Sequence, residues 1–248
     1  MTRMRETVLS LLLMLGMPAF TAAWEAPDDE KIFNVINDGT SPGYYPLLLS
    51  KYMEGDTTLT AADFINLYYG YAYQDAYRPL DATPKEVDDL MTLLASVSEP
   101  DLAESLRLIK AGEEALRADP FNLQVINILV YAYGLTGEKN GEQINYFRLK
   151  NVINTIKSSG TGLSQTAPWH VLTFATETDL ISSMGLQPTK RMIISRTVDY
   201  IPLLVKTDEG VKGYYFDFGR IYWKKPENFD RKRPKGFEIN GMKPALVK

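Results

Sequence analysis

The sequence predicts a mainly helical α+β fold, in which an array of helical hairpins is followed by a small C-terminal β-α-β-β cap. From about residue 33 to residue 158, apolar residues recur at helical spacing behind helix-start signals. After a Ser-Ser-Gly-Thr-Gly break at residues 158–162, the pattern changes to short runs rich in Ile and Val, which are typical of strands. We therefore expect a helical region over residues 24–160 and the cap over residues 161–223.

The first 23 residues have the three-part pattern of a cleavable export signal. Arg3 and Arg5 precede an apolar run from Val8 to Met17, and Thr21-Ala22-Ala23 supplies the small residues that signal peptidases select. A buried N-terminal helix is the alternative interpretation, but it does not account for all three parts. The run is shorter than the ~20 residues that a membrane span needs. We expect cleavage near Ala23 and a periplasmic or secreted protein that does not span a membrane.

Three helix starts are readable in the helical region. Each places a side-chain oxygen before the helix and an acid three residues later, which is the capping-box pattern. The three pairs are Thr60 with Asp63, Thr83 with Glu86, and Ser98 with Asp101. In the second pair, Pro84 takes the first helical position, where its missing N–H group costs nothing.

The helix that follows Thr60 is rich in tyrosine. Its apolar residues form two adjacent stripes at helical spacing, Phe64-Leu67-Tyr68-Tyr71 and Ile65-Tyr69-Tyr73-Tyr77. Because the two stripes cover most of the circumference, we expect the helix to be buried between neighbours. If the ring faces are exposed instead, they favour the stacking of sugars. The candidate binding residues are Tyr69, Tyr73, Tyr77 and Arg78.

Residues 115–122, Ala-Leu-Arg-Ala-Asp-Pro-Phe-Asn, resemble the junction of tetratricopeptide repeats, where Asp-Pro-x-Asn starts a helix. The register continues through Ile126, Leu129, Tyr133 and Gly137, where the repeat has large, leucine, tyrosine and glycine residues. Asn140-Gly141 is interpreted as an insertion before a further helix from about residue 142 to residue 157. The resemblance covers about one and a half repeats, and a regular superhelix needs about three. It therefore implies an array of repeat-type hairpins.

The cap is predicted from short apolar runs around one helix. Strands are expected at residues 169–174, 192–205 and 214–218, and a helix from Thr176 to Met184. Pro202 indicates an edge or a bulge in the second strand, and the last two strands form a hairpin around Thr207-Asp208-Glu209-Gly210. Because so small a unit without cysteine is marginal alone, we expect it to pack against the helical region.

Several segments together are similar to a family of uncharacterised exported proteins of Bacteroides-type bacteria, the domain of unknown function 4919. The similar segments are Gly55-Asp56-Thr57-Thr58-Leu59-Thr60, Leu67-Tyr68-Tyr69-Gly70-Tyr71, Tyr77-Arg78-Pro79, the Asp-Pro-x-Asn junction and Tyr214-Tyr215-Phe216-Asp217. They follow in matching order over about residues 44–220. The resemblance implies export and architecture, and it supplies no activity.

The residue content restricts the chemistry. One histidine, His170, and no cysteine leave too few ligands for a typical metal site, so we interpret His170 as structural and expect no metal and no cofactor. A Gly-x-Ser-x-Gly elbow is missing, and Asp217-Phe218-Gly219 lacks the other kinase motifs. The 31 acidic residues leave hydrolysis by a carboxylate pair open. No catalytic residue is identified, and the sequence leans towards a protein that is not an enzyme.

The charge is divided unevenly along the chain. Residues 224–248 carry a net charge of +5 and residues 24–223 a net charge of −10. The basic tail is not accompanied by an aromatic stacking platform, so we do not expect nucleic acid as a partner. A solvated tail, or one that lies against its own acidic body, is the simpler interpretation.

These observations favour a non-catalytic module that binds a peptide or a protein, or that acts as a scaffold, because stacked helical hairpins form a concave surface. The alternative is a glycan-binding or glycan-processing protein that uses tyrosine stacking. The accessibility of the tyrosine-rich helix discriminates between the two.

Overall fold

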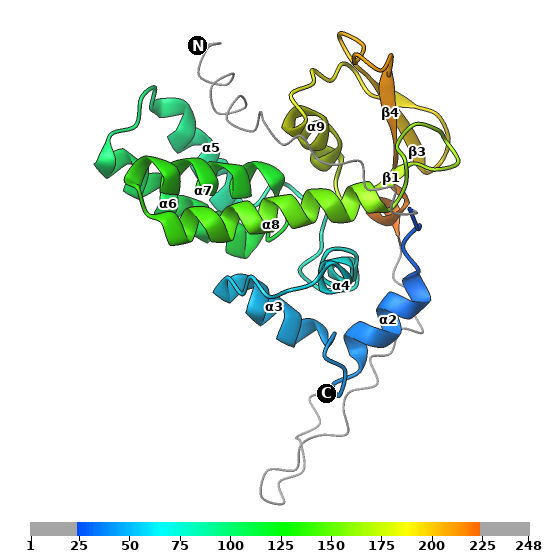
Figure 1. Cartoon of the computed structure of the whole chain (residues 1–248), viewed down its shortest axis with the longest axis horizontal. Helices are drawn as coiled ribbons and strands as arrows, with labels where there is room; N and C mark the ends of the chain where they lie inside the picture. The colour runs from blue at the N-terminus through cyan, green and yellow to red at the C-terminus, as the bar shows by residue number, and fades with distance from the viewer. Residues whose placement is uncertain (1–23, 224–248) are drawn as a thin grey trace, which may run out of the picture.

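The computed structural model describes residues 24–223. The predicted export signal, residues 1–23, and the basic tail, residues 224–248, lie outside the described residues. Between them the chain forms eight α-helices and a small C-terminal four-stranded mixed sheet (Figure 1). The predicted mainly helical α+β fold is therefore confirmed.

The helices and strands have the following bounds. The helices are α2 (Asp29–Asn37), α3 (Tyr45–Glu54), α4 (Ala61–Tyr71), α5 (Lys85–Ser96), α6 (Leu102–Ala118), α7 (Leu123–Thr136), α8 (Lys139–Ser158) and α9 (Phe174–Ser183). The strands are β1 (Trp169–His170), β2 (Met192–Ile193), β3 (Val198–Pro202) and β4 (Gly213–Asp217), and a 3₁₀ turn follows at Gly219–Tyr222.

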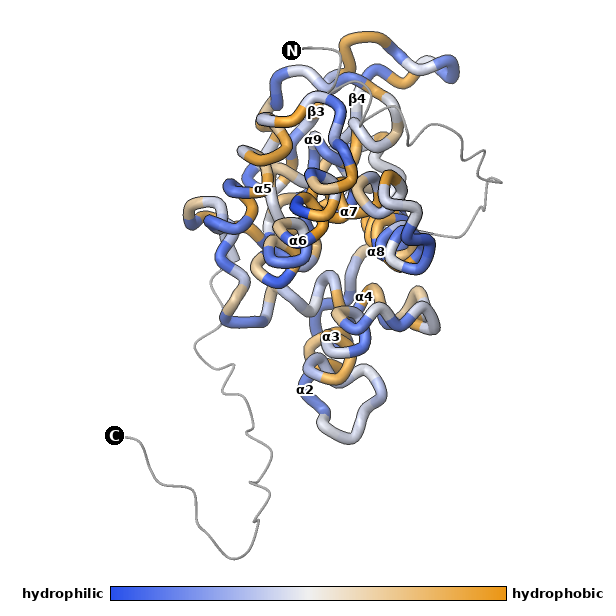
Figure 2. Tube along the Cα trace, turned by 90° about the vertical axis from the view of Figure 1, so that its left-hand side faces the viewer, coloured by the Kyte–Doolittle hydropathy of each residue, from blue (hydrophilic) through white to orange (hydrophobic). Residues whose placement is uncertain are grey.

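Helices α5 to α8 form consecutive hairpins, in which each helix packs against the next one. In Figure 2, α7 is drawn mostly in the hydrophobic colour and lies between α6 and α8. Gly112 allows α6 and α7 to approach closely, because a Cβ atom at this position would lie 2.7 Å from Cδ2 of Leu129. The predicted hairpin packing is present. Helix α8 begins at Lys139 and not near residue 142, so Asn140-Gly141 lies in its first turn, where Glu138 accepts a hydrogen bond from the Gly141 N–H group.

Of the three capping boxes predicted from the sequence, one begins a helix as expected. Thr60 and Asp63 form the capping box that begins α4. The box that begins α6 uses Asp101 and Glu104 instead of Ser98, because the residue before Pro100 is driven away from helical backbone angles.

Helix α5 begins at Lys85 and has no side-chain cap from the described residues. Pro84, with φ of −53° and ψ of 137°, is itself the N-cap residue, so the helix begins one residue later than the predicted Thr83 box requires.

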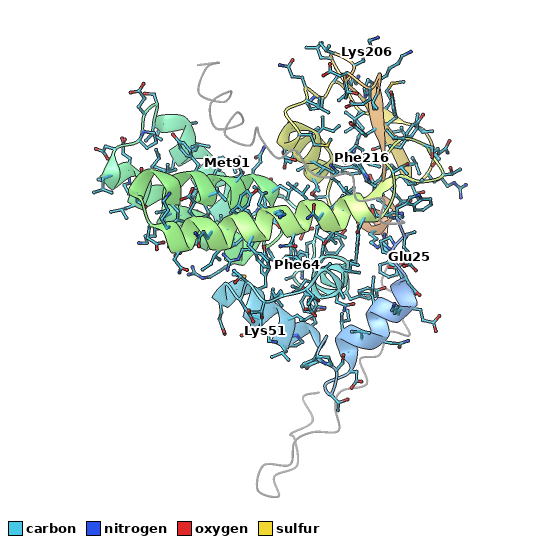
Figure 3. All side chains as sticks on the ribbon, viewed as in Figure 1. Glu25, Lys51, Phe64, Met91, Lys206 and Phe216 are labelled. Atoms are coloured by element: carbon cyan, nitrogen blue, oxygen red, sulfur yellow. The ribbon has the colours of Figure 1, made fainter. Side chains whose placement is uncertain are left out.

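Helix α4 is buried, as predicted, and packs against α2, α3 and α8. Phe64, Leu67, Tyr68 and Tyr69 are at most 1% exposed. Figure 3 shows Phe64 in the interior among the helices and Lys206 at the outer tip of the sheet.

The sheet has the order β1-β4-β3-β2, in which β1 is parallel to β4 and the other neighbours are antiparallel. The predicted hairpin of the last two strands is present. The prediction of one strand over residues 192–205 is wrong, because the chain turns after Ile193 and pairs β2 with β3. The Ser195 hydroxyl stabilises the turn by accepting a hydrogen bond from the Val198 N–H group at 3.1 Å. Pro202 lies at the end of β3, opposite Gly213.

The connection between the helical region and the sheet is folded tightly. The N–H groups of Thr161 and Gly162 both donate to the Ala167 carbonyl, at 3.0 and 2.9 Å. A Cβ atom at Gly160 would lie 2.0 Å from the Pro168 carbonyl oxygen, so a side chain does not fit there. Buried residues of the helices and of the sheet form one hydrophobic cluster. Within residues 24–223, every helix is too short or too polar to cross a membrane.

Candidate functional site

Tyr69 and Tyr73, two of the candidate binding residues, are used inside the protein. Tyr69 is 1% exposed, and its hydroxyl donates to the His170 carbonyl at 3.2 Å. Tyr73 is half-buried, and its hydroxyl donates to the Asp29 carbonyl at 3.0 Å. Its ring packs edge-on against Trp223, with 4.9 Å between the ring centroids. Tyr69 is therefore closed to a ligand, and the Tyr73 ring is already used in packing.

Tyr77 and Arg78 lie beyond the end of α4. Tyr77 is half-buried, packs edge-on against Tyr71, and donates from its hydroxyl to the Leu172 carbonyl at 2.8 Å. Arg78 is exposed and lies 3.7 Å from Asp81 in a surface ion pair. The structure therefore does not bring Tyr69, Tyr73, Tyr77 and Arg78 together on one open surface.

The single histidine belongs to a buried polar cluster. Nη1 of Arg220 lies 3.1 Å from Nδ1 of His170, and Nη2 of Arg220 donates to Asp29 at 2.8 Å. Because arginine can only donate, Nδ1 accepts and the proton of the neutral ring is on Nε2. Burial, together with the neighbouring Arg220 charge, lowers the pKa of His170 to about 4. The cluster joins α2, β1 and the 3₁₀ turn, which is a structural role.

A small cleft with about 20 Å³ of enclosed space, partly open to solvent, lies where the α6–α7 junction meets the start of α9 and the tyrosines in and after α4. Its lining combines aromatic rings with two carboxylates and several small polar groups. The lining residues are Tyr68, Tyr71, Tyr77, Asp119, Phe121, Asn122, Leu123, Leu172, Thr173, Ala175, Thr176 and Asp179.

The Asp-Pro-Phe-Asn junction builds one wall of the cleft. The side chain of Asn122 caps α7 by accepting from the Val125 N–H group at 3.1 Å, and it donates to Asp119 at 3.0 Å. Phe121 is 4% exposed and packs among the buried tyrosines, which fixes the junction in place. Local capping therefore positions the Asp119 carboxylate at the cleft.

The other wall comes from the start of α9. Thr173 caps this helix by accepting from the Thr176 N–H group at 3.2 Å. Asp179, in the second turn, accepts a hydrogen bond from the side chain of Gln124 at 3.0 Å. That bond crosses from α7 to α9, so the two helices are held beside each other at the cleft.

Both carboxylates of the cleft are more basic than usual. Burial raises the pKa of Asp119, although the hydrogen bond from Asn122 opposes the shift. Burial also raises the pKa of Asp179 to about 7; the bond from Gln124 opposes this shift and the nearby Asp119 charge adds to it. At pH 7 the Asp179 carboxyl group is therefore close to half protonated. A pair of this kind can bind a cation or exchange a proton with a ligand.

The pair of Asp119 and Asp179 is not evident from the sequence. In the sequence, Asp119 stands out only as part of a helix junction, and Asp179 only as a residue near a helix start. The two positions are 60 residues apart, and no sequence motif links them.

A second carboxylate pair lies between α9 and the sheet and is closed to solvent. Glu177 and Asp199 are both 0% exposed, and the oxygens of Glu177 have no hydrogen-bond partner among the described residues. Arg191 forms an ion pair with Asp199 at 3.2 Å and stacks over the Phe174 ring at 3.9 Å. Burial, followed by the Asp199 charge, raises the pKa of Glu177 to about 8. Within residues 24–223, no group of three or more His, Cys, Asp or Glu side chains is arranged to hold a metal ion.

Comparison with known proteins identifies a family. The model of a family described as a domain of unknown function, DUF4919, matches residues 30–226. The matched range includes all the segments on which the resemblance is based. No curated protein and no solved structure matches the chain.

Proposed function

Since the chain belongs to the DUF4919 family, whose description carries no activity, we propose from its own geometry that it is an exported, non-catalytic module that binds a peptide or protein partner. The binding site is the cleft between the α6–α7 junction and α9. The group that it binds is a basic side chain of the partner, lysine or arginine.

The carboxylate pair in an aromatic cleft carries this proposal. Burial raises the pKa of Asp119 and of Asp179, and the Asp119 charge adds to the shift of Asp179, so both carboxyl groups resist ionisation. A cation placed between them would relieve both penalties, because an opposite charge nearby favours the ionised form of a carboxyl group. The rings of Tyr71 and Tyr77 line the same cleft, and the face of a tyrosine ring attracts an ammonium or guanidinium group.

The size and surroundings of the cleft favour a side chain over a larger ligand. The enclosed space of the cleft is about 20 Å³, little more than one water molecule needs, so the cleft admits the charged end of a side chain and excludes a larger ligand. The flanking sequence from the end of α6 to α8 resembles tetratricopeptide repeats, whose stacked helices support extended partner surfaces. The glycan alternative is less favoured, because Tyr69 is buried and the Tyr73 ring packs against Trp223.

Selection from an unbiased peptide library, with mature protein immobilised, tests the proposal. We expect enrichment of peptides that contain Lys or Arg. We also expect at least tenfold weaker binding of a selected peptide to Asp119→Asn and Asp179→Asn. Asp88→Asn is the matched control, since Asp88 is exposed on α5. Selection of neutral or acidic peptides only, or unchanged binding by both cleft variants, would contradict the proposal.

Calorimetry of the same complex gives a second readout. Because a bound cation lowers the pKa of Asp179 from about 7, binding at pH 7 should release protons. The measured enthalpy should therefore depend on the ionisation enthalpy of the buffer for the wild type, and less so for Asp179→Asn. Proton release of equal size in both proteins would exclude Asp179 from the site.

A further inference from the structure

The outer edge of the sheet is a second surface, separate from the cleft. The segment of residues 187–195 runs antiparallel to β3 and its continuation. The Leu204 N–H group donates to the Gln187 carbonyl at 2.9 Å, and the Ile194 N–H group donates to the Val198 carbonyl at 2.9 Å. This segment, which we call the β2 edge, is the last in the strand order β1-β4-β3-β2.

The β2 edge presents aliphatic side chains to solvent. Met192, Ile193 and Ile194 are 52%, 71% and 40% exposed. Three consecutive exposed apolar residues on an open strand are unusual, because natural proteins generally blunt such edges to prevent unwanted pairing.

The register directs backbone groups of this edge outward. Ile194 bonds to Val198, and Met192 lies opposite Tyr200, so Ile193 occupies the non-hydrogen-bonded position opposite Asp199. In an antiparallel ladder the N–H and C=O groups of such a residue point away from the neighbouring strand. At Ile193 they point outward from the sheet, where an added strand can bond to them.

The basic residues of the β2 edge indicate which kind of partner it binds. Lys190 and Arg196 flank the apolar residues, and residues 187–197 include no acid. A second copy pairing through the same edge would bring two sets of these cations together. A lipid surface would leave the outward backbone groups of Ile193 without partners. An extended peptide with acidic residues satisfies the backbone groups, the apolar side chains and the charges together.

We propose that the β2 edge is a docking site for an extended, acidic peptide segment of a partner protein, which adds to the sheet as a fifth strand. Main-chain hydrogen bonds to Ile193 provide the pairing, and Lys190 and Arg196 provide the preference for acidic sequences. The proposal does not depend on the cleft.

Fluorescence anisotropy with two synthetic peptides tests it. Both alternate Val and Thr over eight residues, and they carry either Glu or Lys at each end. We expect mature protein to bind the Glu peptide at least tenfold more tightly than the Lys peptide. The double variant Lys190→Glu with Arg196→Glu should reverse that preference. No binding of the Glu peptide, or equal binding of the two peptides, would overturn the proposal.

Ile193→Pro tests the backbone contact. Proline removes an outward N–H group but is compatible with an edge strand, so we expect a folded protein that binds the Glu peptide at least tenfold less tightly. Ile193→Val is the matched control and should bind as the wild type does. Asp179→Asn should also bind normally, which separates this site from the cleft. If the sheet edge instead mediates dimerisation that Ile193→Pro abolishes, or binds anionic vesicles but no peptide, the assigned occupant is wrong.

Discussion

Replacing Glu177 with glutamine should stabilise the protein at neutral pH. The carboxyl group is fully buried and faces Asp199 and Arg191. Its pKa in the folded protein is about 8, compared with 4.5 as the ordinary value. Between these two values the unfolded chain releases the proton while the folded chain keeps it. The free energy of unfolding therefore falls as the pH rises from about 4.5 to about 8, and it is level above that range.

The size of the effect follows from the pKa difference. One pKa unit corresponds to about 1.4 kcal/mol. At pH 7 the raised pKa of Glu177 therefore lowers the free energy of unfolding by about 3 kcal/mol. A glutamine side chain cannot ionise and has nearly the same shape, so the variant escapes this cost. At pH 5 the expected difference between the two proteins is below about 1 kcal/mol.

Urea denaturation at pH 5, 7 and 8.5, followed by tryptophan fluorescence, measures this difference. Glu114→Gln is the control, because Glu114 is exposed on α6, and it should leave stability nearly unchanged at every pH. If Glu177→Gln is no more stable than the wild type at pH 8.5, the pKa of Glu177 is not raised in the folded protein. Arg191 would then be its partner, and the argument from burial would fail.

Three further predictions concern the whole chain. N-terminal sequencing of the protein from its native host should give Trp24, and a retained Met1 would contradict export. Residues 161–248 expressed alone should not give a dispersed NMR spectrum, because the carbonyls of His170 and Leu172 lose the hydroxyls of Tyr69 and Tyr77; a cooperative melt of the fragment would refute this. Arg148→Leu should lower the free energy of unfolding, measured in urea, by about 2–4 kcal/mol, because Arg148 is buried and donates to the carbonyls of Tyr52 and Met53. A loss below about 1 kcal/mol would mean that water replaces its bonds.

Features that depend on local chemistry were predictable from the sequence. The capping box of Thr60 needs only residues within one turn, and the burial of α4 follows from two apolar stripes. The break after Ile193 was not predictable in this way, because Ile and Val have the same preference for strands on both sides of a turn. The break depends on a hydroxyl, that of Ser195, whose role appears only when the chain reverses.

The candidate site was the least predictable part, for a physical reason. The tyrosine-rich motif has the composition of a binding surface, but the hydroxyls of Tyr69 and Tyr77 donate to the carbonyls of the segment that enters α9. Those bonds attach α9 to the helical region, and the attachment forms the cleft in which Asp119 and Asp179 meet. The tyrosines therefore act on the site through the packing that they fix, and the groups available to a ligand come from two helix starts that are distant in sequence. The tyrosines form a motif that is visible in the sequence, whereas Asp119 and Asp179 come together only in the folded chain.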